Sequence, residues 1–143
     1  MYPVPFEAKH IFQMEAQDHQ KWHVESFRET ELAELEDSNA HTLMHEGSPI
    51  ACCGAAVFHK GCVRVWALIS ARAVGIVFLN MSRWAKRFLD SLKFKRIEAT
   101  AAADFPQARQ WLRAMGFKEE GLMRKYEERG ADAYLMALVR EDA

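Results

Sequence analysis

Residues 70–77 combine three features that suit the binding of an anion. Arg72 supplies positive charge, Gly75 lets a ligand approach the backbone closely, and an apolar-patterned helix is expected to begin directly afterwards. The first turn of a helix has N–H groups without an intrahelical partner and carries partial positive charge. The segment therefore suits an anion such as a phosphate group, although these residues alone favour the simpler interpretation that follows. The alternative is a plain turn before a helix, since one glycine-containing loop is a weak signal.

The cysteines and histidines do not form a metal-binding pattern. Cys52 and Cys53 are adjacent, Cys62 stands alone, and the sequence has neither a C-x-x-C nor an H-E-x-x-H motif. Small neighbours favour buried core thiols in a reducing compartment. We expect no metal.

Composition limits the choice of function. A chain of 143 residues is long enough for one domain, and we expect a single domain over 1–143. The net charge of −1 gives no general attraction to nucleic acid or an anionic membrane surface. The longest apolar run, 50–58, is too short to cross a bilayer, and the N-terminus lacks the layout of a secretion signal. We therefore expect a cytoplasmic protein without nucleic-acid or membrane partners.

The elements around the candidate loop are well marked. Segment 41–70 predicts three strands, with turns at 46–49 and 59–61 short enough for antiparallel neighbours. Segment 75–92 predicts a long helix, because its apolar residues recur at i, i+3, i+4, i+7 and i+11. This buried stripe is Met81, Trp84, Ala85, Phe88 and Leu92.

The C-terminal half repeats the alternation of strand and helix. "RIEATAA" at 96–102 predicts a strand, and the next helix has Asp104 as a candidate cap and Pro106 in its first turn. Gly116 and Phe117 predict the end of that helix and the start of another strand. A final hairpin is expected to turn around 128–132.

The N-terminal region is less clearly patterned. "FEAKHIFQM" suggests a short helix, and Ser26 with Glu29 fits a capping box before a helix that carries Leu32 and Leu35. The complete order predicts an α+β fold with a mostly antiparallel sheet and a central strand–helix–strand unit.

The motif "A-x-x-W-L-x-x-M-G-F-x-x-E-G" at 108–121, within this order of elements, resembles the GNAT superfamily of acyl-CoA-dependent N-acyltransferases. The resemblance extends from about Ser26 to the end of the chain. The blocks "VWALIS", "RIEAT" and "FPQARQWLRAMGF" resemble small GNAT-like proteins encoded by tailed phages. Some of those relatives are acetyltransferases, and more distant ones are internal virion proteins. The resemblance thus implies a phage-encoded chain in the host cytoplasm, or one associated with the virion.

The resemblance implies a mixed sheet flanked by helices, whose splayed strands form a V-shaped cleft for the co-substrate acetyl-CoA. Backbone groups of one splayed strand would bind pantetheine, and the loop after it would bind the pyrophosphate. The residues implied are Ala67, Leu68 and Ile69 for the strand, and Arg72, Ala73, Val74, Gly75 and Ile76 for the loop. The family loop ends in a small residue, whereas Val77 stands there in this chain. In that family, Trp22 would fall in the region that forms the acceptor entrance.

The resemblance also suggests candidates for proton transfer. Glu98 lies on a strand that would line the cleft and is a candidate general base, although an ion pair with Arg96 or Arg64 is the simpler interpretation. The tyrosine that commonly protonates the leaving thiolate is replaced by Leu112, and an asparagine of the same helix by Phe105.

The last hairpin offers substitutes for the missing tyrosine. Tyr126 is our candidate general acid, with Tyr134 as a second choice, and core packing is the alternative for each. Strand exchange at this hairpin is common in the family, which makes a homodimer an expectation as well.

Three functions remain open from the sequence. The first is transfer of acetyl from acetyl-CoA to an amine of a protein or a small molecule. The second is a catalytically degenerate GNAT-fold protein that acts in the virion or on the host. The third is a CoA-binding regulator without turnover.

A basic cluster would attract the CoA 3′-phosphate or an acidic partner, or else form a solvated face. It comprises Lys86, Arg87, Lys93, Lys95 and Arg96.

Overall fold

The computed structural model describes residues 1–15, 17, 20, 34–36 and 38–141. The predicted capping box at Ser26 and Glu29, and the predicted role of Trp22, lie outside the described residues. The strands are β1 (Tyr2–Pro5), β2 (Asn39–His45), β3 (Ser48–His59), β4 (Cys62–Ile69), β5 (Arg96–Ala102), β6 (Lys118–Met123) and β7 (Ala133–Val139). The helices are α1 (Ala8–Gln13), α4 (Gly75–Ser91) and α5 (Pro106–Ala114).

The strands form one mixed sheet in the order β1-β2-β3-β4-β5-β7-β6. β4 and β5 are parallel, with Cys62 opposite Arg96 and Arg64 opposite Glu98. The pairs β1–β2, β2–β3, β5–β7 and β6–β7 are antiparallel. The predicted fold class, an open and mostly antiparallel sheet with flanking helices, is therefore confirmed. The V-shaped cleft and the single domain remain predictions, because the chain divides into two compact units, each described here by itself.

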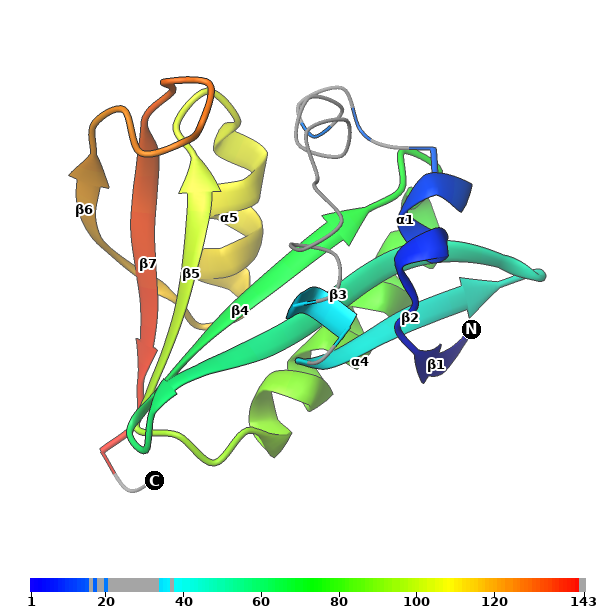
Figure 1. Cartoon of the computed structure of the whole chain (residues 1–143), viewed down its shortest axis with the longest axis horizontal. Coiled ribbons are helices and arrows are strands. Elements are labelled where there is room, and N and C mark those ends of the chain that lie inside the picture. The colour runs from blue at the N-terminus through cyan, green and yellow to red at the C-terminus, as the bar shows by residue number, and fades with distance from the viewer. Residues whose placement is uncertain (16, 18–19, 21–33, 37, 142–143) are drawn as a thin grey trace. The chain divides into compact units, whose positions relative to one another are not determined.

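Unit 1 comprises Met1–Ala56 and Trp66–Leu92. Its helices pack on opposite faces of the strands, as Figure 1 shows for α1 in front and α4 behind. On β2, Thr42 contacts His10 of α1, whereas the preceding residue, His41, packs its ring against Trp84 of α4. Adjacent residues of a strand face opposite sides, so this alternation explains the two layers.

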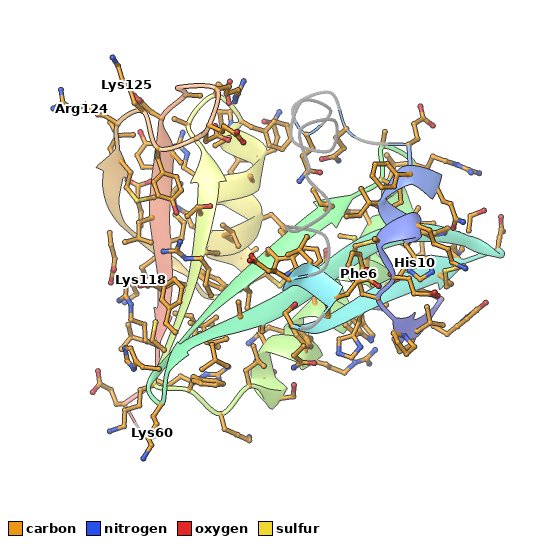
Figure 2. The ribbon with its side chains drawn as sticks, viewed as in Figure 1. Phe6, His10, Lys60, Lys118, Arg124 and Lys125 are labelled. Carbon is orange, nitrogen blue, oxygen red and sulfur yellow. The ribbon has the colours of Figure 1, made fainter. Side chains whose placement is uncertain are left out.

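One apolar cluster of unit 1 lies under α1. Phe6 and Ile11 pack there with Cys52 of β3 and Leu68 of β4, and all four are almost fully buried. The ring of Phe6 lies edge-on to Trp66, and also to His10, which lies beside it in Figure 2. The cluster therefore fixes the position of β4 relative to β3.

Unit 2 comprises Val57–Val65 and Lys93–Ala143. Buried Ile97, Ala99 and Ala101 of β5 alternate with the more exposed Arg96, Glu98 and Thr100. Helix α5 contacts β5, β6 and β7.

The end of α5 follows the sequence prediction. Gly116 has φ +108, its N–H donates to the carbonyl of Arg113, and the N–H of Phe117 donates to the carbonyl of Leu112. These two bonds form a Schellman motif, which needs a residue of positive φ and so favours glycine. The exposed cations Lys118, Arg124 and Lys125 of the following hairpin are labelled in Figure 2.

The start of α5 differs from the sequence prediction. Phe105, not Asp104, is the N-cap residue, and it makes no side-chain cap bond. Pro106 does occupy the first turn, as predicted. The Asp104 carboxylate instead pairs with Arg129 at 3.0 Å. The sequence interpretation missed this pair because the two side chains are 25 residues apart.

Candidate functional site

Strand β4 leads from the apolar cluster into the candidate loop. The N–H of Ser70 donates to the carbonyl of Ile50 on β3 over 2.9 Å. Backbone polar groups alternate along a strand, so Ala67 and Ile69 direct theirs to the edge opposite β3. These two residues belong to the predicted pantetheine strand, and between them Leu68 packs into the core.

The edge of β4 is contacted by a side chain that the sequence interpretation did not select. The Gln20 side chain donates from Nε2 to the carbonyl of Ala67, and its Oε1 accepts from the N–H of Ile69, both at 3.2 Å. Gln20 lies in a region without clear periodicity, so no sequence signal distinguishes it from the neighbouring polar residues.

Most amides of the loop before α4 have partners within unit 1. The N–H of Ala71 donates to the carbonyl of Glu15, that of Arg72 to Ser70 Oγ, and that of Ala73 to the Ser70 carbonyl. The N–H of Val74 donates to the carbonyl of Arg72. The loop is therefore shaped by its own hydrogen bonds, and these amides are already used.

The first turn of α4 is different. The N–H groups of Gly75, Ile76 and Val77 have no acceptor among the described residues, and the N-cap residue Val74 provides no side-chain cap. The first turn contains no acidic residue. An uncapped helix N-terminus attracts an anion through its free N–H groups and its dipole. Exposed Arg72 adds a positive charge nearby, so these residues fit a phosphate group.

Gly75 is suited to its place by conformation and by space. Its φ is +58, a region that side-chain-bearing residues rarely adopt, and a Cβ built there would meet no atom within 4 Å. The sequence interpretation assigned this glycine to close approach of a ligand, and the open space is compatible with that role.

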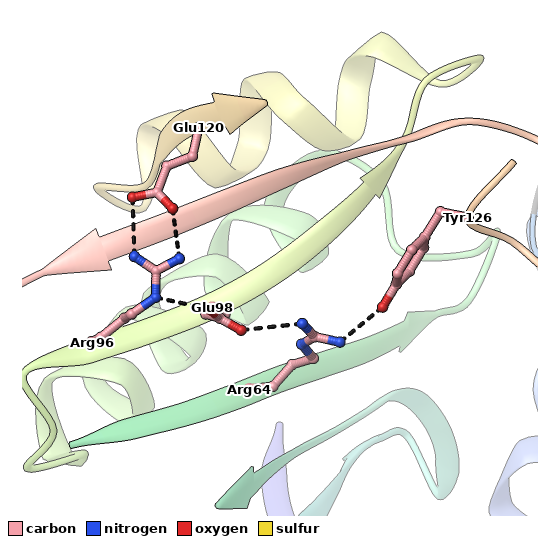
Figure 3. Close-up of polar contacts among 5 residues, drawn as sticks. All are labelled: Arg64, Arg96, Glu98, Glu120 and Tyr126. Atoms are coloured by element: carbon pink, nitrogen blue, oxygen red, sulfur yellow. Dashed lines mark hydrogen bonds and ion pairs between the residues drawn. The ribbon is translucent and has the colours of Figure 1, made fainter. Parts of the chain in front are cut away.

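A second group of candidate residues lies in unit 2, on the face of β5 that carries Arg96 and Glu98 (Figure 3). Glu98 accepts from Arg96 Nε at 2.8 Å and from Arg64 Nη2 at 3.1 Å. Arg96 also binds Glu120 of β6 through both Nη atoms, at 3.0 and 2.5 Å. The ion pairs that the sequence offered as the simpler interpretation of Glu98 are both present.

These contacts decide the charge of Glu98. Hydrogen bonds from Arg96, followed by those from Arg64, hold the pKa of this carboxyl below its ordinary value of 4.5, although partial burial opposes the shift. Its side chain is 12% exposed. Glu98 is therefore an anion at neutral pH, but a lowered pKa makes it a weak proton acceptor. Its role as general base remains a prediction.

Tyr126 joins the same network. Arg64 Nη1 donates to the Tyr126 hydroxyl oxygen at 2.8 Å, so Arg64 bridges Tyr126 and Glu98 (Figure 3). Arg64 also lies over the ring of Phe58, 4.8 Å from its centroid. The two residues predicted for proton transfer thus share one guanidinium, which the sequence gave no means to foresee. The role of Tyr126 as acid remains a prediction.

The other tyrosine candidate has a different environment. The ring of Tyr134 is half-buried and covered by the guanidinium of Arg109 at 4.2 Å. Leu112, which stands where the family tyrosine would be, is only 9% exposed. Tyr126, in contrast, is 45% exposed and able to contact a solute.

The described residues contain no group of three or more His, Cys, Asp or Glu side chains that would bind a metal ion. Burial raises the pKa of the Cys52 thiol to about 11, and burial also raises that of Cys53.

Two residues of the predicted basic cluster are already paired. Lys86 pairs with Asp90 at 2.9 Å, and Arg96 bonds to Glu98 and Glu120 as described above. No helix within the described part of the chain combines the length and apolarity needed to span a membrane.

Comparison with solved structures identifies the fold. Ard1 from Thermoplasma volcanium superposes with a TM-score of 0.76 at 14% identity, covering 96% of each chain. An acetyltransferase of the GNAT family from Bacillus anthracis gives a TM-score of 0.72 at 16% identity, covering 98% of this chain and 95% of that one. An aminoglycoside 6′-acetyltransferase type Ii gives 0.67 at 12% identity, with 97% of each chain covered.

The chain has the GNAT fold. No family model matches the sequence, and no curated protein matches it either. At these identities the likeness establishes the fold alone, so the activity of this GNAT-fold chain must be argued from its residues.

Proposed function

We propose that this chain is an N-acetyltransferase that takes acetyl from acetyl-CoA and transfers it to an amine. The observation that carries the proposal is the uncapped N-terminus of α4, which directly follows β4 and has Arg72 beside it. The free N–H groups of Gly75, Ile76 and Val77 suit the CoA pyrophosphate. The fold shared with named acetyltransferases supports the same conclusion by analogy.

The proposed reaction requires two proton movements. The amine nitrogen attacks the thioester carbonyl, the C–S bond breaks, the amine loses a proton, and the CoA thiolate gains one. We assign proton donation to Tyr126, because its oxygen accepts from Arg64 and its own proton has no acceptor in the described part of the chain. The Arg64 cation would stabilise the negative charge left on the phenol. Glu98 is our candidate base, acting as an anion held by Arg64 and Arg96.

A catalytically degenerate GNAT-fold protein is the second candidate, supported by Leu112. This residue fills the tyrosine position with a buried apolar side chain. Under this alternative, no amine would cause release of the CoA thiol from acetyl-CoA, whether or not the chain binds CoA. Under either candidate function, we propose that the chain is phage-encoded and acts in the host cytoplasm or in the virion.

Titration calorimetry with acetyl-CoA tests the proposal through Ile76. This residue is 66% exposed in the first turn of α4, so it can be replaced without loss of packing. Ile76→Glu places an anion where the helix dipole stabilises it, by about 0.3–1 kcal/mol, but where it repels the pyrophosphate. We expect higher thermal stability together with weaker binding of acetyl-CoA. Ile76→Lys should have the opposite effect on both quantities.

Arg72→Ala should also weaken binding, and Arg83→Ala is its matched control, an exposed arginine of α4 two turns from the N-terminus. If acetyl-CoA at millimolar concentration gives neither heat nor a thermal shift with the unmodified chain, the proposal is wrong. If it binds and no amine in a thiol-release screen yields free CoA, the degenerate alternative is the better description.

A further inference from the structure

Gln20 contacts β4 in the manner of a neighbouring strand. In a parallel ladder, one residue bonds to the carbonyl of residue i−1 and to the N–H of residue i+1 on the partner strand. The single carboxamide of Gln20 does the same around Leu68, because it donates to Ala67 and accepts from Ile69. This edge of β4 is therefore built to hold an amide, and it holds one supplied by the chain itself.

Two further backbone hydrogen bonds involve described residues just before Gln20 or Gln20 itself. The N–H of Gln20 donates to the carbonyl of Gln17 at 2.9 Å. The carbonyl of Glu15 accepts from the N–H of Ala71 at 2.7 Å, beside the candidate phosphate loop. Glu15 and Gln20 therefore both bond to this part of the chain, Gln20 to the edge of β4 and Glu15 to the loop after it.

We propose that Gln20 is a built-in competitor for the amide of an incoming pantetheine chain, which must displace its carboxamide from Ala67 and Ile69 to bind. This inference rests on the proposed function, since it assumes that acyl-CoA uses the edge of β4. The exchange replaces one amide by another, so hydrogen bonds are conserved for a ligand with an amide at this place. A ligand without one would leave the two backbone groups unpaired, which is unfavourable.

The proposal separates two parts of the co-substrate. The nucleotide end would bind at the N-terminus of α4 and would not contact the edge that Gln20 occupies. Gln20 should therefore lower the affinity for CoA but not for adenosine 3′,5′-bisphosphate, which lacks pantetheine. By this argument Gln20 reduces the difference in affinity between CoA and a nucleotide that lacks pantetheine.

Calorimetric titration of the full chain with CoA and with adenosine 3′,5′-bisphosphate tests this idea in Gln20→Ala and Gln20→Met. Methionine keeps the length of the side chain and loses both hydrogen bonds, so Gln20→Met still provides a test if Gln20→Ala fails to fold. Removing two neutral hydrogen bonds should raise the affinity for CoA roughly 5- to 30-fold in both variants. The affinity for the bisphosphate should not change. Gln13→Ala, an exposed glutamine of α1, is the matched control.

Amide hydrogen exchange at Ile69 gives a readout that does not depend on affinity. Exchange should be faster in Gln20→Met than in the unmodified chain, and CoA should slow it again in both. Unchanged or weaker CoA binding in both Gln20 variants would refute the claim that Gln20 competes with pantetheine, but would not affect the proposed function. No CoA binding in any variant, including the unmodified chain, overturns both.

Discussion

Replacing Gly54 by alanine should destabilise the protein, because Trp66 fills the space that the new Cβ would need. A Cβ on Gly54 would lie 2.7 Å from Nε1, 2.8 Å from Cε2 and 2.9 Å from Cζ2 of Trp66. Gly54 is buried and the indole packs against the apolar cluster under α1, so the ring must shift. Overpacking costs about 1–3 kcal/mol, and the reduced entropy of the unfolded chain returns about 0.4–1 kcal/mol. The expected net loss is about 1–2 kcal/mol.

A double-mutant cycle with Trp66→Phe isolates this contact. Phenylalanine lacks the Nε1 and Cζ2 atoms that the new Cβ would meet, so Gly54→Ala should become neutral or slightly stabilising in that background. Urea unfolding of the four proteins gives the coupling free energy. Gly121→Ala is the control, because a Cβ there meets nothing within 4 Å. An equal loss in both backgrounds would refute the steric argument.

Three further predictions concern single residues. Folded Glu98 has a lowered pKa, so the unfolded chain binds its proton more readily, and this contribution to stability is present above about pH 4.5 and lost as pH falls. Urea midpoints between pH 7 and 3 should therefore fall less in Glu98→Gln than in the unmodified chain; parallel curves would contradict this. Gly116→Ala should cost about 1–2 kcal/mol in the same assay, because φ is +108, and an unchanged midpoint would exclude strain. The Cys52 thiol, fully buried with its pKa raised to about 11, should resist alkylation at pH 8 until the protein unfolds, and rapid labelling of the folded chain would disprove it.

The parts of the fold that the sequence predicts are those set by local rules. Helix α4 follows from a repeating apolar stripe, and the end of α5 follows from Gly116, whose backbone conformation few other residues adopt. The antiparallel pairing of β6 with β7 follows from the turn predicted around 128–132. In each case the decisive residues are near one another in the chain, so a single sequence contains the necessary information.

Strand β1 was not predicted, because its proline content disfavours a strand. Two of its four residues, Pro3 and Pro5, cannot donate a backbone hydrogen bond. Among the described residues β1 lies at the edge of the sheet and pairs with β2 alone, so one row of its N–H groups needs no partner in the sheet. Proline is tolerated at such an edge, and only the position in the sheet reveals it.

The candidate site depends on pairings between distant residues. Arg64 reaches Tyr126 across 62 positions, and Gln20 reaches Ile69 across 49. Sequence reasoning selected Glu98, Tyr126 and the loop as separate features. It could not show that one guanidinium joins Glu98 to Tyr126, since only the fold brings these side chains together.

The position of Leu112 bears on which residue could act as the acid. Its carbonyl accepts the bond that closes the Schellman motif, and its side chain is buried. A tyrosine hydroxyl introduced there would have to leave the core or lose its hydrogen bonds to water, which is unfavourable. The proton donor, if this chain turns over, must therefore come from another element. Tyr126 meets the physical requirements, because its phenol is exposed and its oxygen already accepts a bond from a cation. Loss of the usual tyrosine is thus compatible with catalysis.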